Sequence, residues 1–206
     1  MNASEQLLAG AKVLDVSLHS EQANQLHSFL LLIQKWNQTY NLVGASDTET
    51  LLTKHILDSL AVAPFINQDP ILDVGSGGGL PGIPLAIARP DLSFTLLDAN
   101  GKKTRFMRQA MIELKLSNVE VVQERLENYV SQPLANIVLA RAFAPLEQAL
   151  SQLAEQCAPK NGQVIIMLGT KPEPLPAMPN LKNIASHEIV VPGLDSQRHL
   201  CVATKT

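Results

Sequence analysis

The chain lacks several features that would assign it to a common class. Its 206 residues include only two cysteines, Cys157 and Cys201, whose spacing matches neither a metal site nor a redox pair. No apolar run approaches the ~18 residues that span a bilayer, and no basic stretch followed by an apolar core marks a secretory signal. We therefore expect a cytoplasmic monomer that uses neither a membrane nor a metal, with both thiols buried.

The chain also lacks the basic surplus typical of nucleic-acid-binding proteins, because its formal net charge is −3. The charge is unevenly distributed: residues 1–69 carry three bases and seven acids, whereas residues 101–115 carry five bases and one acid. The five bases are Lys102, Lys103, Arg105, Arg108 and Lys115. This segment predicts either phosphate contacts with RNA or a solvated helix face, and both interpretations stay open.

Glycine, in contrast, is concentrated at one place. The run Ile71-Leu72-Asp73-Val74 is followed by a loop with five glycines, Gly75-Ser76-Gly77-Gly78-Gly79-Leu80-Pro81-Gly82. Glycine permits backbone angles that other residues resist and leaves no side chain between main chain and ligand. A strand that leads through such a loop into a helix is typical of nucleotide sites. A P-loop is excluded, because Ile83 stands where its lysine would be needed.

Two acids narrow the choice of nucleotide. Asp73, just before the glycines, would repel a pyrophosphate but suits the ammonium group of S-adenosylmethionine. Asp98 ends the next apolar run, at the spacing of a ribose-binding acid, roughly 20 residues on. Asp73, Gly75, Gly77 and Asp98 therefore favour a methyl-donor site over a nicotinamide site. A glycine turn without any ligand is the remaining alternative.

The apolar pattern divides the chain into two parts. Residues 1–69 predict an N-terminal helical extension, with amphipathic helices over 20–36 and 47–62, the second capped by Asp47. From residue 70 onward, short apolar runs alternate with helical patterns near 82–89, 101–115 and 145–157. The first five strands are expected at 71–74, 94–97, 119–122, 136–139 and 164–168.

This alternation predicts an α/β fold with a mostly parallel sheet. After a proline-rich loop at 171–180, two apolar runs near 183–191 and 198–204 have no helix between them and predict a hairpin. A parallel sheet that closes with an antiparallel last strand is the plan of the Rossmann-like S-adenosylmethionine-dependent methyltransferases. We expect residues 70–206 to form this core, in one compact unit with the helical extension.

Short segments along nearly the whole chain carry a family resemblance. They are Lys35-Trp36-Asn37 with Tyr40-Asn41-Leu42, His55-Ile56-Leu57-Asp58-Ser59, the glycine loop continued by Ile83-Pro84-Leu85, Leu96-Leu97-Asp98 with Gly101-Lys102-Lys103, Arg141-Ala142-Phe143-Ala144, and Arg198-His199-Leu200. In these segments the chain resembles the glucose-inhibited division protein B family, the bacterial 16S rRNA guanine-N7 methyltransferases.

The resemblance implies a substrate, N7 of the guanine at position 527 in 16S rRNA or in a small-subunit precursor, and S-adenosylmethionine as cofactor. It also implies a donor site that includes Gly75, Leu80, Leu126, Glu127 and Arg141. One departure stands out: where the family tends to have Lys-Gly after the fifth strand, this chain has Leu168-Gly169. The role of that lysine is therefore lost or passes to Lys171.

The chemistry of this reaction makes small demands on the protein. Guanine N7 has an in-plane lone pair and no proton, so orientation rather than a general base supplies the acceleration. Arg141 follows an apolar run, and its fork matches guanine O6 and N7. We take it as the candidate catalytic residue, with a structural ion pair as the alternative. Phe143 is a candidate for stacking on the base or for the core.

Other polar residues have weaker assignments. His55 and Asp58 lie three apart on one helix face and predict a hydrogen-bonded pair that anchors the helix to the sheet, with a base–acid pair as the alternative. Arg198 and His199 begin the last strand and are candidates for RNA contact. Two other functions also remain open: methylation of a small molecule or protein, and S-adenosylmethionine binding by a non-catalytic regulator.

Overall fold

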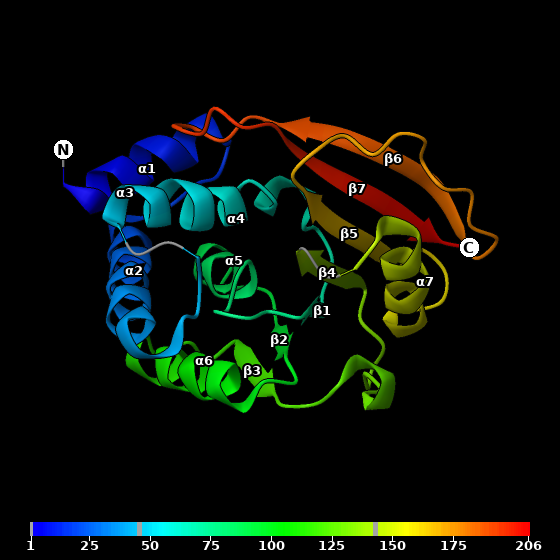
Figure 1. Cartoon of the computed structure of the whole chain (residues 1–206), viewed down its shortest axis with the longest axis horizontal. Helices are drawn as coiled ribbons and strands as arrows, with labels where there is room; N and C mark the ends of the chain where they lie inside the picture. The colour runs from blue at the N-terminus through cyan, green and yellow to red at the C-terminus, as the bar shows by residue number, and fades with distance from the viewer. Residues whose placement is uncertain (1, 45–46, 142–143) are drawn as a thin grey trace.

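A computed structural model of the chain describes residues 2–44, 47–141 and 144–206. In this part of the chain one seven-stranded sheet has the order β3-β2-β1-β4-β5-β7-β6 (Figure 1). The strands are β1 (Ile71–Val74), β2 (Phe94–Leu97), β3 (Val119–Val122), β4 (Ile137–Arg141), β5 (Gln163–Leu168), β6 (Leu181–Ile189) and β7 (Arg198–Lys205). Strand order reverses at β1, next to β4, where open α/β sheets bind their ligands.

The strand directions confirm the predicted fold. β1 to β5 run parallel, whereas β7 runs antiparallel to both β5 and β6. β4 extends two residues beyond the predicted end, so that Arg141 is its last residue. The predicted hairpin is present, and its second strand lies between β5 and the edge strand β6.

Helices cover both faces of the sheet (Figure 1). They are α1 (Ala3–Val13), α2 (Ser20–Tyr40), α3 (Thr48–Leu51), the π-turn η1 (Leu52–Leu57), α4 (Asp58–Leu60), the short 3-10 helices η2 (Ala63–Phe65) and η3 (Leu126–Asn128), α5 (Gly82–Ala88), α6 (Gly101–Glu113) and α7 (Leu146–Gln156). No helix in the described residues is long and apolar enough to cross a bilayer.

The two predicted N-terminal helices are present with changed details. The first was expected to break after Trp36 but continues to Tyr40, whose ring packs on Trp36 one turn earlier with centroids 5.2 Å apart. It ends at Asn41, which has a left-handed φ of 47°. The second begins as predicted, because Oδ1 of Asp47 accepts from the amide of Thr50 at 2.8 Å. Its middle is the π-turn η1.

Alternating strand residues build two hydrophobic clusters. Ile71, Ile137 and Leu139 face the larger one with α1 to α6, whereas Leu72, Val138 and Ala140 face the smaller one with α7. The larger cluster contains residues from both 1–69 and 70–206, and Phe29 of α2 stacks on Phe106 of α6 with centroids 6.1 Å apart. The helical extension is therefore packed onto the same face of the sheet as α5 and α6.

Candidate functional site

A glycine loop connects β1 to α5 at the carboxyl edge of the sheet. Gly75, Gly77 and Gly79 have φ angles of 69°, 58° and 77°, in the left-handed region that favours glycine. The amide of Gly77 donates to Oδ2 of Asp98 at 2.9 Å, and Oδ1 of Asp98 accepts from the amide of Asn100 at 2.8 Å. Because Asn100 caps α6, Asp98 ties the glycine loop to the start of that helix.

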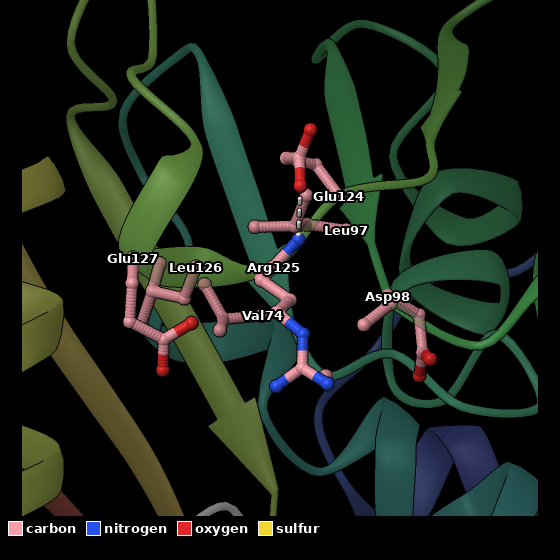
Figure 2. Close-up of a pocket in the computed structure, with 9 residues that line it drawn as sticks. Val74, Leu97, Asp98, Glu124, Arg125, Leu126 and Glu127 are labelled. Atoms are coloured by element: carbon pink, nitrogen blue, oxygen red, sulfur yellow. Dashed lines mark hydrogen bonds between the residues drawn. The ribbon is translucent and has the colours of Figure 1, made fainter.

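A cavity of about 250 Å³, here called the β1–β2 cavity, opens beside this loop between the ends of β1 and β2 and the segment that enters η3 (Figure 2). It brings together four of the predicted donor residues, Gly75, Asp98, Leu126 and Glu127. Figure 2 shows the side chain of Arg125 extending between Asp98 on one side and Glu127 on the other. A cavity of about 250 Å³ is slightly smaller than typical small-molecule sites, which measure about 300–1,000 Å³.

The charge of the β1–β2 cavity indicates which kind of nucleotide it can bind. Its lining includes three carboxylates, Asp98, Glu124 and Glu127, and one guanidinium, Arg125. This negative excess repels a pyrophosphate and attracts a ligand with a positive charge. A carboxylate offers about four lone-pair sites, so Asp98 can accept ribose hydroxyls in addition to its two backbone bonds. The cavity therefore fits a nucleoside that carries a cationic group.

Asp73 lies beneath the glycine loop and does not line the cavity. Its side chain is fully buried, and Oδ2 accepts from the amide of Gly82, the first residue of α5, at 2.9 Å. Burial raises the pKa of Asp73 to about 6, although the Gly82 hydrogen bond opposes this shift. Oδ1 has no hydrogen-bond partner among the described residues. This oxygen is also buried, so it does not reach a ligand in this conformation and the predicted ammonium contact stays a prediction, while the other oxygen holds the start of α5.

Arg141 belongs to a group of side chains that we call the arginine cluster: His55, Asp58, Arg141 and Arg198. Nη1 of Arg141 lies 3.8 Å from Oδ2 of Asp58 and 3.5 Å from Nδ1 of His55. Nε of Arg198 donates to Oδ1 of Asp58 at 2.9 Å. Asp58 therefore forms ion pairs with two arginines, one of them also hydrogen-bonded, rather than a hydrogen bond with His55. The predicted anchoring of this helix to the sheet is present, but through different residues.

Burial sets the protonation of the arginine cluster. Burial, and then the charges of Arg141, Lys54 and Arg198, lower the pKa of His55 to about 4, so its ring is neutral at pH 7. Burial also raises the pKa of Asp58, against the effect of the two arginines. The register pairs Ala140 with Val74, so Arg141 lies level with Gly75. The cluster is therefore a neighbour of the glycine loop.

The basic residues of α6 do not share one face. Lys102, Arg105 and Arg108 are exposed and line a groove of about 720 Å³, the α6 groove, together with Gln123. Lys103 is half-buried and lies over the glycine loop, because its Nζ is 3.7 Å from where a Cβ on Gly77 would be. Arg108 donates from Nη2 to the carbonyl of Val121 at 3.3 Å. Lys102 and Arg105 are thus the most available for a polyanion.

Several predicted residues have mainly structural surroundings. Leu80 is 1% exposed and packs in the core below the loop. Arg198 also donates from Nη1 to Oγ of Ser196 and to the carbonyl of Gln197. His199 is 4% exposed in a strand flanked by β5 and β6. Its burial argues against the predicted RNA contact in this conformation, because the ring does not reach the surface.

Two more sequence-based expectations concern segments after β4 and β5. Phe143, the candidate for stacking on a base, lies outside the described residues. Leu168 pairs with His199 across β5 and β7. Lys171, the possible substitute for the family lysine, forms an exposed ion pair with Glu173.

The sequence-based reasoning missed Glu124, Arg125 and the pairing of Arg198 with Asp58. The first two follow β3 after one residue, Gln123, and the position after a parallel strand is the signal that points to them. Arg198 and Asp58 are 140 positions apart, and no local pattern links them.

A family model described as rRNA small subunit methyltransferase G matches residues 22–200. The ribosomal RNA small subunit methyltransferase G of Ectopseudomonas mendocina is 43% identical and covers 98% of this chain and 96% of its own length. That of Nitrosococcus oceani is 46% identical over 93% of this chain and 90% of its own length. That of Shigella flexneri is 42% identical over 91% of both chains.

Two solved structures resemble the fold. A magnesium protoporphyrin IX methyltransferase from Synechocystis, with bound S-adenosylmethionine, has a TM-score of 0.60 and 13% identity over 86% of this chain and 97% of that chain. A tRNA methyltransferase from Aquifex aeolicus has a TM-score of 0.54 and 13% identity over 73% of this chain and 68% of that chain. At such low identity the likeness concerns the fold alone, and it confirms the predicted Rossmann-like methyltransferase architecture.

Proposed function

The chain belongs to the rRNA small subunit methyltransferase G family, and from this premise we propose that it transfers a methyl group from S-adenosylmethionine to N7 of a guanine, position 527, in 16S rRNA. Family membership makes the chain a methyltransferase of small-subunit ribosomal RNA.

The observation that carries the proposal is the β1–β2 cavity with its negative charge next to the glycine loop. When bound, S-adenosylmethionine supplies an activated methyl group on a positively charged sulfur. Asp98 accepts the ribose hydroxyls, and Leu126 and Glu127, which line the same cavity, hold the base of the nucleoside. Gly75 and Gly77 allow close backbone approach, and buried Leu80 supports the loop.

The arginine cluster is compatible with N7 as the acceptor atom. N7 needs no deprotonation, so the cluster has to orient the guanine rather than take a proton from it. Arg141 projects from the end of β4 beside the glycine loop, where its guanidinium can donate to guanine O6 or to a phosphate and leave the N7 lone pair free to attack the methyl group. His55 is neutral at pH 7, so it adds no positive charge beside Arg141.

The α6 groove is proposed to contact the RNA backbone. Lys102 and Arg105 are exposed there, with Arg108 beside them. The groove and the β1–β2 cavity meet at the N-terminus of α6, where Asp98 bonds to Asn100. RNA phosphates in the groove would therefore bring a nucleotide close to the donor. Lys103 lies nearer to the glycine loop, and we propose that it acts at the junction of the two.

The test compares acceptors directly. Purified protein and labelled S-adenosylmethionine are incubated with naked 16S rRNA, small ribosomal subunits, or a panel of metabolites and proteins. The product RNA is then cleaved at N7-methylguanine and mapped by mass spectrometry. We expect one N7-methylguanine at position 527, missing in a strain that lacks the protein and restored by wild type. A methyl group on another atom would contradict the proposal, and methylation of metabolites but not RNA would establish the small-molecule alternative.

A further inference from the structure

Asp58 is a buried carboxylate in the middle of a helical segment, which is an unusual position for a charged residue. The residue is 4% exposed, and burying a carboxylate costs several kcal/mol unless partners compensate. Its partners come from distant parts of the chain, β4 and β7. The carboxylate thus links the helical extension to the two strands that flank β5.

The two oxygens of Asp58 are held differently. Oδ1 accepts from Nε of Arg198 at 2.9 Å, and the same guanidinium is fixed by Ser196 and by the carbonyl of Gln197. Oδ2 lies 3.8 Å from Nη1 of Arg141, which is beyond hydrogen-bond distance but close enough for strong attraction where water is scarce. One side of the carboxylate is therefore fixed and the other faces a guanidinium that keeps some freedom.

The local helix geometry contributes to this arrangement. The π-turn η1 ends at Leu57, directly before Asp58. A π-turn inserts an additional residue into a helical turn and so rotates the residues that follow, and such turns occur frequently at functional sites. His55 lies within the turn, and its Nδ1 is 3.5 Å from the same Nη1 of Arg141. His55 of the turn and Asp58 just after it thus both lie close to Nη1 of Arg141.

We propose that Asp58 is a positioning residue that acts through Arg141, with Arg198 fixing the orientation of its carboxylate. The proposal rests on the role of Arg141 in the proposed function. Burial lowers the pKa of the Arg141 guanidinium, and the charges of Asp58 and Asp73 both oppose this shift. In this arrangement Arg198 acts two steps away from the substrate and does not contact it.

A double-mutant cycle on the methyl-transfer step tests the proposal. Single-turnover rates at saturating donor and RNA are measured for wild type, Asp58→Asn, Arg141→Ala and the double variant. We expect Asp58→Asn to slow the reaction about ten- to a hundredfold, as misplacement of an orienting group does, with donor affinity changed less than twofold. In the Arg141→Ala background the same change should slow the reaction no further.

Other outcomes separate the inference from its premise. A wild-type rate for Asp58→Asn, or two effects that multiply, would overturn the positioning role. A wild-type rate for Arg141→Ala would remove the proposed role of Arg141 as well. If Asp58→Asn does not fold, Arg198→Lys takes its place, because it keeps the charge but loses the Nε contact, and the same cycle applies. Asp91→Asn, which breaks the exposed pair with Arg89, is the matched control and should react like wild type.

Discussion

The β1–β2 cavity and the arginine cluster lie at the same edge of the sheet but are held together differently. Backbone amides of Gly77 in the glycine loop and of Asn100, the cap of α6, organise the cavity through Asp98. Side chains from η1, α4, β4 and β7 form the cluster, and most of their surface is buried. Replacements in the cavity should therefore change ligand affinity with little effect on folding, whereas replacements in the cluster should change both.

The largest effect is expected at the glycine loop. Gly77→Val forces a branched residue into a φ of 58°, which costs about 1–3 kcal/mol of strain and displaces the amide that binds Asp98. Donor affinity should fall at least about a hundredfold, measured by calorimetry with S-adenosylhomocysteine. Gly169→Val is the control, because a Cβ there meets nothing within 4 Å. Unchanged affinity in a folded Gly77→Val protein would contradict the site.

Replacing Asp98 tests whether donor binding in the cavity depends on this one carboxylate. Charge-assisted hydrogen bonds contribute about 1.5–3 kcal/mol, so Asp98→Ala should weaken donor binding about ten- to a hundredfold. RNA affinity should hardly move. Glu124→Gln removes the same charge from the same lining and should change donor affinity less than about threefold. Equal losses in the two variants would mean that overall charge, and not the ribose contact, governs binding.

The proposed contact between the α6 groove and RNA phosphates should depend on salt concentration, unlike donor binding in the cavity. If Lys102 and Arg105 meet phosphates, replacing both by glutamine should flatten the slope of log affinity against log salt by about 1–2, since each phosphate contact contributes about 0.7–0.9. Lys115 and Lys160 are exposed and do not line the groove, so replacing them should leave the slope unchanged. The readout is RNA binding over a salt series, and an unaltered slope in the groove variant would identify a solvated face.

The smallest net effect is expected in how the free energy of unfolding depends on pH. Two buried groups set this dependence, Asp73 below the glycine loop and His55 in the arginine cluster. The raised pKa of Asp73, about 6 against 3.8, gives stability that is present below pH 3.8 and lost as pH rises to 6. The lowered pKa of His55, about 4 against 6.5, gives stability that is present above pH 6.5 and lost as pH falls to 4. The two trends oppose each other between pH 4 and 6.

Replacing either Asp73 or His55 should leave the pH dependence of stability that the other residue causes. Urea unfolding of His55→Gln should show stability that falls between pH 4 and 6, whereas Asp73→Asn should show stability that rises over the same range. Asp58 is present in both variants, so the difference between them reports Asp73 and His55 alone. Parallel pH profiles in the two variants would contradict the assigned protonation states.

The same contrast explains what the sequence could and could not predict. The sheet, its antiparallel strand β7 and the gathering of Gly75, Asp98, Leu126 and Glu127 follow from local patterns, because residues after parallel strands meet at one edge. The continuation of α2 to Tyr40 was missed, since polar residues there suggested a break. The partners of Asp58 could not be found, because pairing over 140 positions depends on the finished fold.

Because of the position of β7, the sheet can be completed only after the last strand has been synthesised. β7 follows β6 along the chain, yet it lies between β5 and β6 in the sheet. A growing chain can pair β1 to β5 as they appear, but β6 has no strand beside it until residues 198–205 have been made. The aspartate made early at position 58 likewise waits for Arg198. Completion of the sheet and assembly of the arginine cluster therefore both wait for residues 198–205, and a chain that stops before residue 198 has neither.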